Sequence, residues 1–171
     1  MRLLVRGGDY CRVADPGWAD PLDPSFSRER GGRWNPPGRF AVVYLNSSMQ
    51  LARAQLRTKL GRRGLEPEDL IATAAPLLVD VRVPEDHYAD VVTARGVQAA
   101  GLAPTYPLDA AGRVVPHETC RPFGVLAHRE AIPGIACRPA AAKAPVGSEE
   151  LAYFGRRRLK LLKRRRFEDW Y

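Results

Sequence analysis

The order of apolar and polar positions predicts strands and helices that do not alternate regularly. Predicted strands share short apolar or alternating runs bounded by turn residues, at residues 2–14, 40–45, 77–83, 134–137 and 151–154. Helices are predicted over residues 49–60, 93–100 and 120–131, the last of them beginning after Pro122. This pattern indicates an α/β domain with a mixed α+β sheet, and it lacks the regular βαβ order of a doubly wound sheet.

The predicted helix over 49–60 follows a strand directly. Polar side chains at 46–48 are suited to cap its N-terminus, and Gly61 is suited to end it. Leu51, Gln55 and Lys59 have the i, i+4 spacing that places them on one face. Gln55 is considered as a candidate site residue, but from the spacing alone a partly exposed helix position is the more typical interpretation.

Residues 15–39 are rich in Gly, Pro and Asp but also contain Trp18, Phe26 and Trp34. A long loop without regular structure is uncommon in a compact domain unless it is functional or disordered. Disordered segments are poor in aromatic residues. We therefore expect this loop to be packed and to line a site.

The densest chemical signal is the block from Gly31 to Gly38, which reads Gly-Gly-Arg-Trp-Asn-Pro-Pro-Gly. Glycines allow the backbone to approach a ligand closely. Arg33 offers a planar set of donors suited to phosphate oxygens, and Trp34 offers a stacking face. The alternative is a structural turn in which Arg33 pairs with a carboxylate and Trp34 belongs to the core.

Composition is ordinary for a globular protein, with 171 residues of which 45% are hydrophobic. The net charge of +8 is concentrated near the C-terminus, where eight Lys and Arg residues lie between Arg156 and Arg166. We expect one domain over residues 1–154, followed by a basic tail or helix over 155–171. Such a tail could bind nucleic acid, an anionic membrane or an acidic partner, or it could be solvated or docked on the domain.

Other classes of protein are disfavoured by the sequence. No apolar run reaches the length of about 18 residues that a membrane span requires, and the first residues are too charged for a signal peptide, so we expect a cytoplasmic protein.

Cys11, Cys120 and Cys137 are odd in number and scattered, which favours reduced thiols. His117 and Cys120 do not complete a metal-ligand pattern, so no metal is expected. A nucleophilic pair between a cysteine and a histidine stays an alternative.

Several blocks in a fixed order resemble the RES domain family over about residues 10–154. They are residues 10–16, 31–38, 43–45, 120–124, 133–138 and 150–154. The resemblance implies a fold similar to that of ADP-ribosyltransferases. It also implies a toxin of a toxin–antitoxin pair, which takes NAD as its substrate and breaks the bond between nicotinamide and ribose by hydrolysis or phosphorolysis. The implied partner is an antitoxin protein.

The resemblance also implies site residues. The catalytic candidates are Arg33, Tyr44 and Gln55, the last standing where the family has glutamate. The residues implied to bind NAD are Gly32, Arg33, Trp34, Tyr44, Arg138 and Pro139. Pro139 stands where the family has serine, and it offers neither a hydroxyl nor a backbone donor.

These two departures leave alternatives for the function. Gln55 keeps hydrogen-bonding ability but lacks the negative charge that would stabilise a positively charged ribose. One alternative is therefore a catalytically weakened protein that binds NAD, another ADP-ribose-containing ligand or a partner protein. The other is a nucleic-acid-directed protein that uses the basic segment between Arg156 and Arg166.

Overall fold

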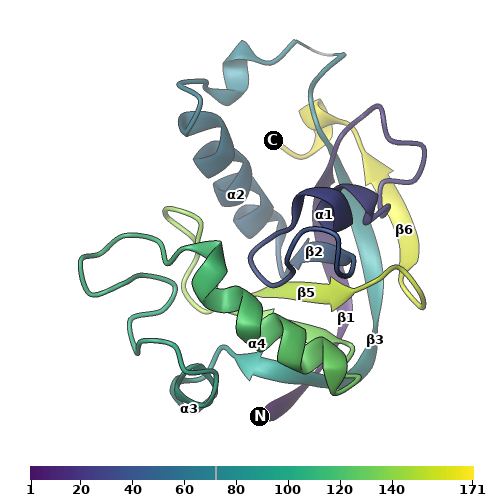
Figure 1. Ribbon diagram of the computed structural model, residues 1–171. Coiled ribbons are helices and arrows are strands. Elements are labelled where there is room, and N and C mark those ends of the chain that lie inside the picture. The colour runs from purple at the N-terminus through teal and green to yellow at the C-terminus, as the bar shows by residue number, and fades with distance from the viewer. Residues whose placement is uncertain (72) are drawn as a thin grey trace.

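A computed structural model describes residues 1–71 and 73–171. Its strands are β1 (Leu3–Ala14), β2 (Val42–Asn46), β3 (Leu77–Val91), β4 (Gly134–Cys137), β5 (Glu150–Phe154) and β6 (Lys160–Arg165). Its helices are α1 (Ser25–Arg30), α2 (Met49–Gly61), α3 (Ala94–Ala99) and α4 (His117–Arg129), with short 3-10 helices at Pro67–Asp69 and Phe167–Asp169. In Figure 1, α2, α3 and α4 lie to the left of β3 and β6.

The sheet has the order β1-β2-β5-β4-β3-β6, and β1 also pairs with β3. β3 is long enough to pair with β1 along one edge and with both β6 and β4 along the other. Among the described residues, β1, β2, β5, β4 and β3 therefore form a closed ring, with β6 added outside it. The β3–β4 pairing is parallel and the others are antiparallel, which confirms the prediction of a mixed sheet.

The two faces of the sheet are covered by different parts of the chain. Alternate residues of β2 point to opposite faces. Val42 belongs to a core that includes Phe123 and Ala127 of α4, whereas Val43 belongs to a second core with Tyr88 of β3. A third cluster joins α2 to β1 and to the C-terminal segment. Tyr44 and Asn46 lie on the same face as Val42, toward the C-terminal end of β2.

The strands and helices predicted within residues 1–154 are present, but some bounds differ, and β3 extends to Val91 rather than ending at residue 83. α2 begins where the sequence indicates, because the Ser48 side chain accepts a hydrogen bond from the backbone N–H of Leu51 at 3.1 Å. α4 begins at His117 and continues through Pro122, so the predicted start after Pro122 is wrong. A proline near the start of a helix removes only one intrahelical hydrogen bond, and here the helix tolerates it. The loop over 15–39 also contains one short helix, α1.

The basic segment over 155–171, expected as a tail or a helix, forms a strand and not the helix. Residues 160–165 form β6, because β3 presents an edge that the ring leaves unpaired, and Arg165 forms an ion pair of 2.6 Å with Asp80 of β3. The chain then packs Trp170 into the third cluster, where its side chain is 1% exposed. Lys and Arg side chains on an exposed edge strand prevent that edge from pairing with another chain. The basic residues of β6 can therefore have a structural role at the edge of the sheet.

No helix in the described part of the chain has the length and apolar character needed to cross a membrane. α2 and α4 contain 13 residues each.

Candidate active site

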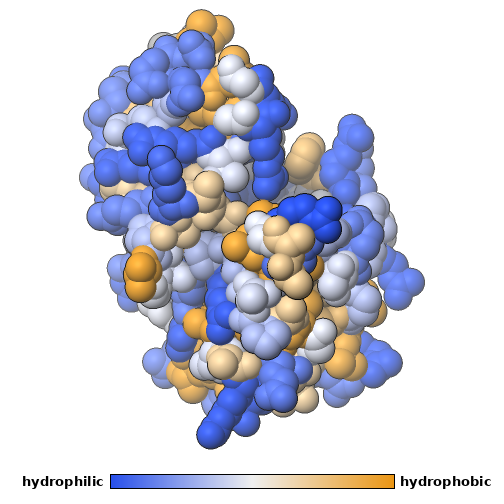
Figure 2. All heavy atoms as spheres, turned by 90° about the vertical axis from the view of Figure 1, so that its left-hand side faces the viewer, coloured by the Kyte–Doolittle hydropathy of each residue, from blue (hydrophilic) through white to orange (hydrophobic). Residues whose placement is uncertain are grey.

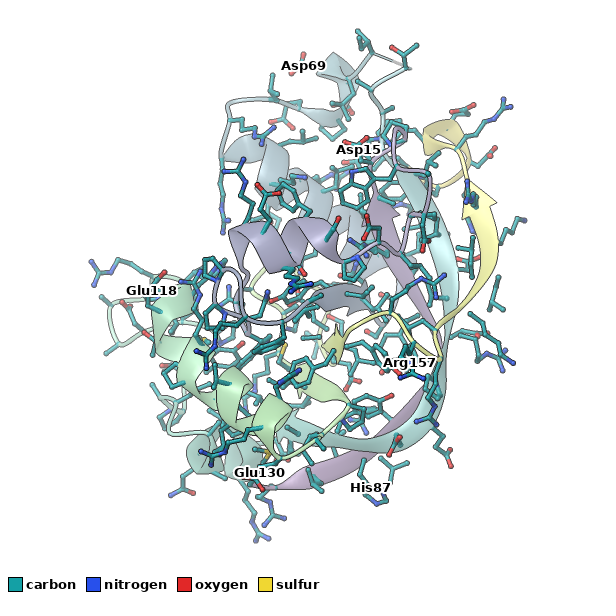
Figure 3. All side chains as sticks on the ribbon, turned by 45° about the vertical axis from the view of Figure 1, so that its right-hand side comes forward. Asp15, Asp69, His87, Glu118, Glu130 and Arg157 are labelled. Carbon is teal, nitrogen blue, oxygen red and sulfur yellow. The ribbon has the colours of Figure 1, made fainter. Side chains whose placement is uncertain are left out.

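A cleft of about 390 Å³ opens between α2 and the end of the sheet. It is lined by β1, the loop after α1, the C-terminal half of β2, α2, the first residue of α4, the loop after β4 and the first residue of β5. Figure 2 turns the left-hand side of Figure 1 toward the viewer and shows hydrophilic residues gathered over the upper part of this face, where α2 lies. In Figure 3, Glu118 marks the N-terminal end of α4, which is the end nearer to α1 and α2.

The loop from Gly31 to Gly38 forms one wall of the cleft and is held rigidly by Tyr44. The Tyr44 hydroxyl accepts a hydrogen bond from the backbone N–H of Trp34 at 3.1 Å and donates one to Asn35 Oδ1 at 3.0 Å. Gly32 packs so closely on this hydroxyl that an added Cβ would lie 2.3 Å from it. Burial raises the pKa of Tyr44, so the hydroxyl stays protonated at neutral pH.

Arg33 reaches the cleft from this loop and is only 8% exposed. Its Nη1 donates a hydrogen bond to the carbonyl of Val115 at 3.2 Å. The neighbouring carbonyl of Gly32 accepts a hydrogen bond from Arg121 Nε of α4 at 3.1 Å. Val115, just before α4, and Arg121 of α4 thus fix the guanidinium and the loop, which leaves other donors of Arg33 available for a ligand.

The opposite wall is one face of α2. Gln55, Thr58, Lys59 and Arg62 line the cleft with the spacing of helical neighbours. The Thr58 hydroxyl accepts a hydrogen bond from the backbone N–H of Ala142 at 3.0 Å, which ties the loop after β4 to the helix. The face that the sequence predicted through Gln55 and Lys59 therefore faces the cleft.

The charges that line the cleft are unequal in sign. Arg12, Arg33, Lys59 and Arg62 are cationic, and Glu150 is the single carboxylate among the described lining residues. Burial lowers the pKa of Arg12 to about 10, which still leaves this guanidinium charged at neutral pH, and its buried Nη1 has no hydrogen-bond partner among the described residues. This balance of charge suits an anionic ligand.

Two further titratable groups of the cleft have shifted pKa values. Burial raises the pKa of Glu150 to about 7, while the charge of Arg33 acts in the opposite direction. Burial and the nearby charge of Arg33 lower the pKa of His117, so this imidazole is neutral at pH 7. Groups with such shifts in a cleft are typical of functional sites.

Comparison with known proteins agrees with this architecture. The model of the RES domain family matches residues 8–158. The chain belongs to the RES domain family. Its fold is similar to that of a chain in the crystal structure of the M. tuberculosis MbcT–MbcA toxin–antitoxin complex, with a TM-score of 0.78 and 23% identity over 96% of this chain and 86% of that chain. No curated protein is significantly similar in sequence.

The RES fold brings together most of the residues that the sequence singled out. Gly32, Arg33, Tyr44 and Gln55 come from three separate segments and line the same cleft. Pro139 lies in the loop after β4, directly before Ala140, which lines the cleft. Ser148, the nearest downstream serine, is not a lining residue, and its hydroxyl donates a hydrogen bond to the carbonyl of Pro145 at 2.6 Å.

Besides Pro139, two residues predicted to bind NAD do not line the cleft, Trp34 and Arg138. Trp34 is fully buried, and its indole N–H donates a hydrogen bond to Cys137 Sγ at 3.3 Å, so the expected stacking face is not available. Gly124 of α4 approaches so closely that an added Cβ would lie 1.8 Å from the Trp34 carbonyl oxygen. Arg138 instead donates hydrogen bonds to backbone carbonyls beyond β3, with Nε 2.8 Å from the Val92 oxygen. Both side chains therefore form contacts within the domain and do not contribute to the surface of the cleft.

Other lining residues were not assigned to the site from the sequence. The polar ones are Arg12, Asn46, Thr58, Lys59, Arg62, His117 and Glu150. Lys59 shares a predicted helix face with Gln55, and Glu150 begins one of the family blocks, so both carried a signal. His117 follows a turn-rich segment, and only the fold brings it near Arg33.

The alternative based on cysteine chemistry gains no support. Cys11, Cys120 and Cys137 are all buried and free, and burial raises the pKa of each thiol, which disfavours the nucleophilic thiolate. Within residues 1–71 and 73–171, no group of three His, Cys, Asp or Glu side chains is arranged to hold a metal ion. His128 stacks on Phe40, with 4.1 Å between the ring centroids.

Proposed function

We propose that this protein is a RES-type toxin whose cleft binds NAD and cleaves the bond between nicotinamide and ribose. The observation that carries the proposal is the convergence of Arg33, Tyr44 and Gln55 on one cleft. These are the residues to which the family resemblance assigns the catalytic positions, and they come from separate segments of the chain.

The charge of the cleft supports NAD as the substrate. NAD contains a diphosphate, and the cleft is lined by four cationic side chains against one carboxylate. A guanidinium binds phosphate oxygens through two parallel hydrogen bonds, which fixes orientation as well as charge. We assign this role to Arg33, because its guanidinium is already positioned by the Val115 carbonyl. Lys59 of α2 and Arg62, directly after this helix, add positive charge.

The reaction begins with departure of nicotinamide. The bond from its ring nitrogen to ribose breaks, both electrons go to the nitrogen, and positive charge develops on the ribose. An oxygen of water or of phosphate then forms a bond to the same ribose carbon. The Gln55 amide can hold a ribose hydroxyl, and Tyr44 keeps the Arg33 loop in place. Because positioned electrostatic groups supply much of the rate, the orientation of these residues before binding matters.

A protein partner is part of the proposal. The similar structure is that of a toxin–antitoxin complex. We propose that this chain also has an antitoxin. We further propose that the chain acts on the NAD of the cytoplasm. Expression of the chain alone in a bacterial host should lower cellular NAD and arrest growth, and co-expression with its antitoxin should prevent both effects.

A second candidate is a protein that binds NAD without cleaving it. Gln55 favours this candidate, because an amide cannot stabilise the positive ribose by charge. The two candidates differ in turnover: both predict NAD binding that depends on Arg33, and only the first predicts release of nicotinamide.

The test is nicotinamide release from NAD by the purified protein, with and without phosphate. Arg33→Ala should abolish release, whereas Arg113→Ala is a matched control, because the Arg113 side chain is 80% exposed and lies outside the cleft. Dependence of the rate on phosphate would identify the acceptor. Equal release by the native protein and by Arg33→Ala would refute the proposed site.

A further inference from the structure

The cleft has a carboxylate, but at a different position from the one that Gln55 occupies. Glu150, the first residue of β5, lines the cleft together with Gln55, Arg33 and Tyr44. It is half-buried, and it is the single carboxylate among the lining residues that the structure describes.

The register of the sheet fixes where the Glu150 side chain points. Glu150 lies directly opposite Asn46 of β2 and opposite Cys137 of β4. Residues directly opposite one another in a sheet point to the same face, and residues two apart along a strand do so as well. Glu150 is therefore on the same face as Asn46 and Tyr44, which is the face that the Arg33 loop and α2 enclose.

Glu150 differs from its neighbour Glu149 in its partners. Glu149 points to the other face, where Arg6 Nε lies 2.7 Å away and the Tyr10 hydroxyl donates a hydrogen bond at 2.8 Å. The Glu150 carboxylate has no hydrogen bond or ion pair with any described residue, and only the more distant charge of Arg33 acts on it. An unpaired, half-buried carboxylate destabilises a fold, so its presence in a cleft indicates a role with a ligand.

We propose that Glu150 supplies the carboxylate of the active site, in place of the charge that Gln55 lacks. This inference rests on the proposed function. In it, Glu150 lies against the nicotinamide-bearing ribose of NAD and stabilises the positive charge that develops there.

The carboxylate has a second role when water is the acceptor. As nicotinamide leaves with the electrons of its bond to ribose, the water oxygen bonds to the ribose carbon and one water proton passes to a Glu150 oxygen. The products are nicotinamide, ADP-ribose and protonated Glu150, which then releases its proton to solvent. A pKa of about 7 suits a group that must accept a proton at neutral pH and release it again.

The other groups around Glu150 would not produce the same pH dependence. The pKa of Tyr44 is raised, and that of His117 is lowered from its ordinary value, so a change in rate caused by His117 would lie at lower pH than one caused by Glu150. The buried Cys137 thiol of β4 also has a raised pKa. The remaining charged groups of the cleft are cations: Arg12 of β1, Arg33 of the loop, Lys59 of α2 and Arg62 directly after it.

The experiment compares nicotinamide release by the native protein, Glu150→Gln, Gln55→Glu and the double variant. Glu150→Gln should lower kcat by about 10²–10³, the cost of losing one positioned electrostatic group, while KM changes by less than about threefold. Native kcat should rise with pH through about 7, and the remaining activity of Glu150→Gln should lack that rise. Adding Gln55→Glu to Glu150→Gln should restore part of kcat, because a carboxylate again faces the ribose.

Glu130→Gln is the control, because Glu130 is exposed and lies beyond the far end of α4 (Figure 3). If the native protein releases nicotinamide and Glu150→Gln is equally active, this inference is overturned and the proposed function stands. Loss of NAD binding in Glu150→Gln in parallel with activity would assign Glu150 to the structure of the site instead. A native protein that releases no nicotinamide would refute the proposed function and this inference together.

Discussion

The unpaired Glu150 carboxylate makes the stability of the protein depend on pH in a defined direction. Its pKa rises from 4.5 to about 7 on folding. Between these values the folded protein holds a proton that the unfolded chain has released, so the free energy of unfolding falls as the pH rises. Each pKa unit corresponds to about 1.4 kcal/mol, which gives an upper limit of about 3 kcal/mol. Because the side chain is half-buried, we expect about 1–2 kcal/mol.

Glu150→Gln tests this reasoning, since glutamine has nearly the same shape and no titrating group. Below about pH 4.5 the native and variant proteins should be equally stable, and at pH 8 the variant should be more stable. For a domain of this size, the gain corresponds to a Tm higher by roughly 2–8 °C at pH 8. Thermal unfolding followed by circular dichroism at pH 4.5 and 8 measures it. A variant that is less stable at pH 8, or that shifts Tm equally at both pH values, would refute the pKa and its cause.

Three further predictions concern the walls of the cleft and the C-terminal segment. Tyr44→Phe leaves the Trp34 N–H and the Asn35 side chain without a partner, so urea unfolding should show a loss of about 1–3 kcal/mol, and nicotinamide release should fall. Gly124→Ala forces α4 away from the Arg33 loop and should cost more than about 2 kcal/mol, with Tm as the measurement. Trp170→Ala should cost about 3–5 kcal/mol in urea unfolding, whereas a dispensable tail would show no change.

The sequence predicts the local elements well because their determinants are local. The Ser48 cap and the helical spacing of Gln55 and Lys59 lie within a few residues of one another, and α2 has the expected start and face. The apolar runs of β2, β4 and β5 likewise determine buried strands without reference to the rest of the chain.

The sequence predictions are wrong where residues distant in the chain determine the local structure. Residues 160–165 belong to a dense basic run that is compatible with a helix. They form β6 because β3 has a free edge, and nothing within the segment indicates that edge. Trp34 is a plausible stacking residue in a Gly-rich loop, yet the close approach of Gly124 on α4 encloses it in the core. The role inferred for Glu150 depends on the register of β2, β4 and β5, which a single sequence does not specify.

We propose that the cleft between the Arg33 loop and α2 cleaves NAD, and one measurement tests this most directly. Proton NMR of NAD incubated with the purified protein follows the loss of the nicotinamide–ribose bond directly. We expect free nicotinamide with the native protein and with Arg113→Ala, and none above the blank with Arg33→Ala. Intact NAD with the native protein, in both the presence and the absence of phosphate, would contradict the claim.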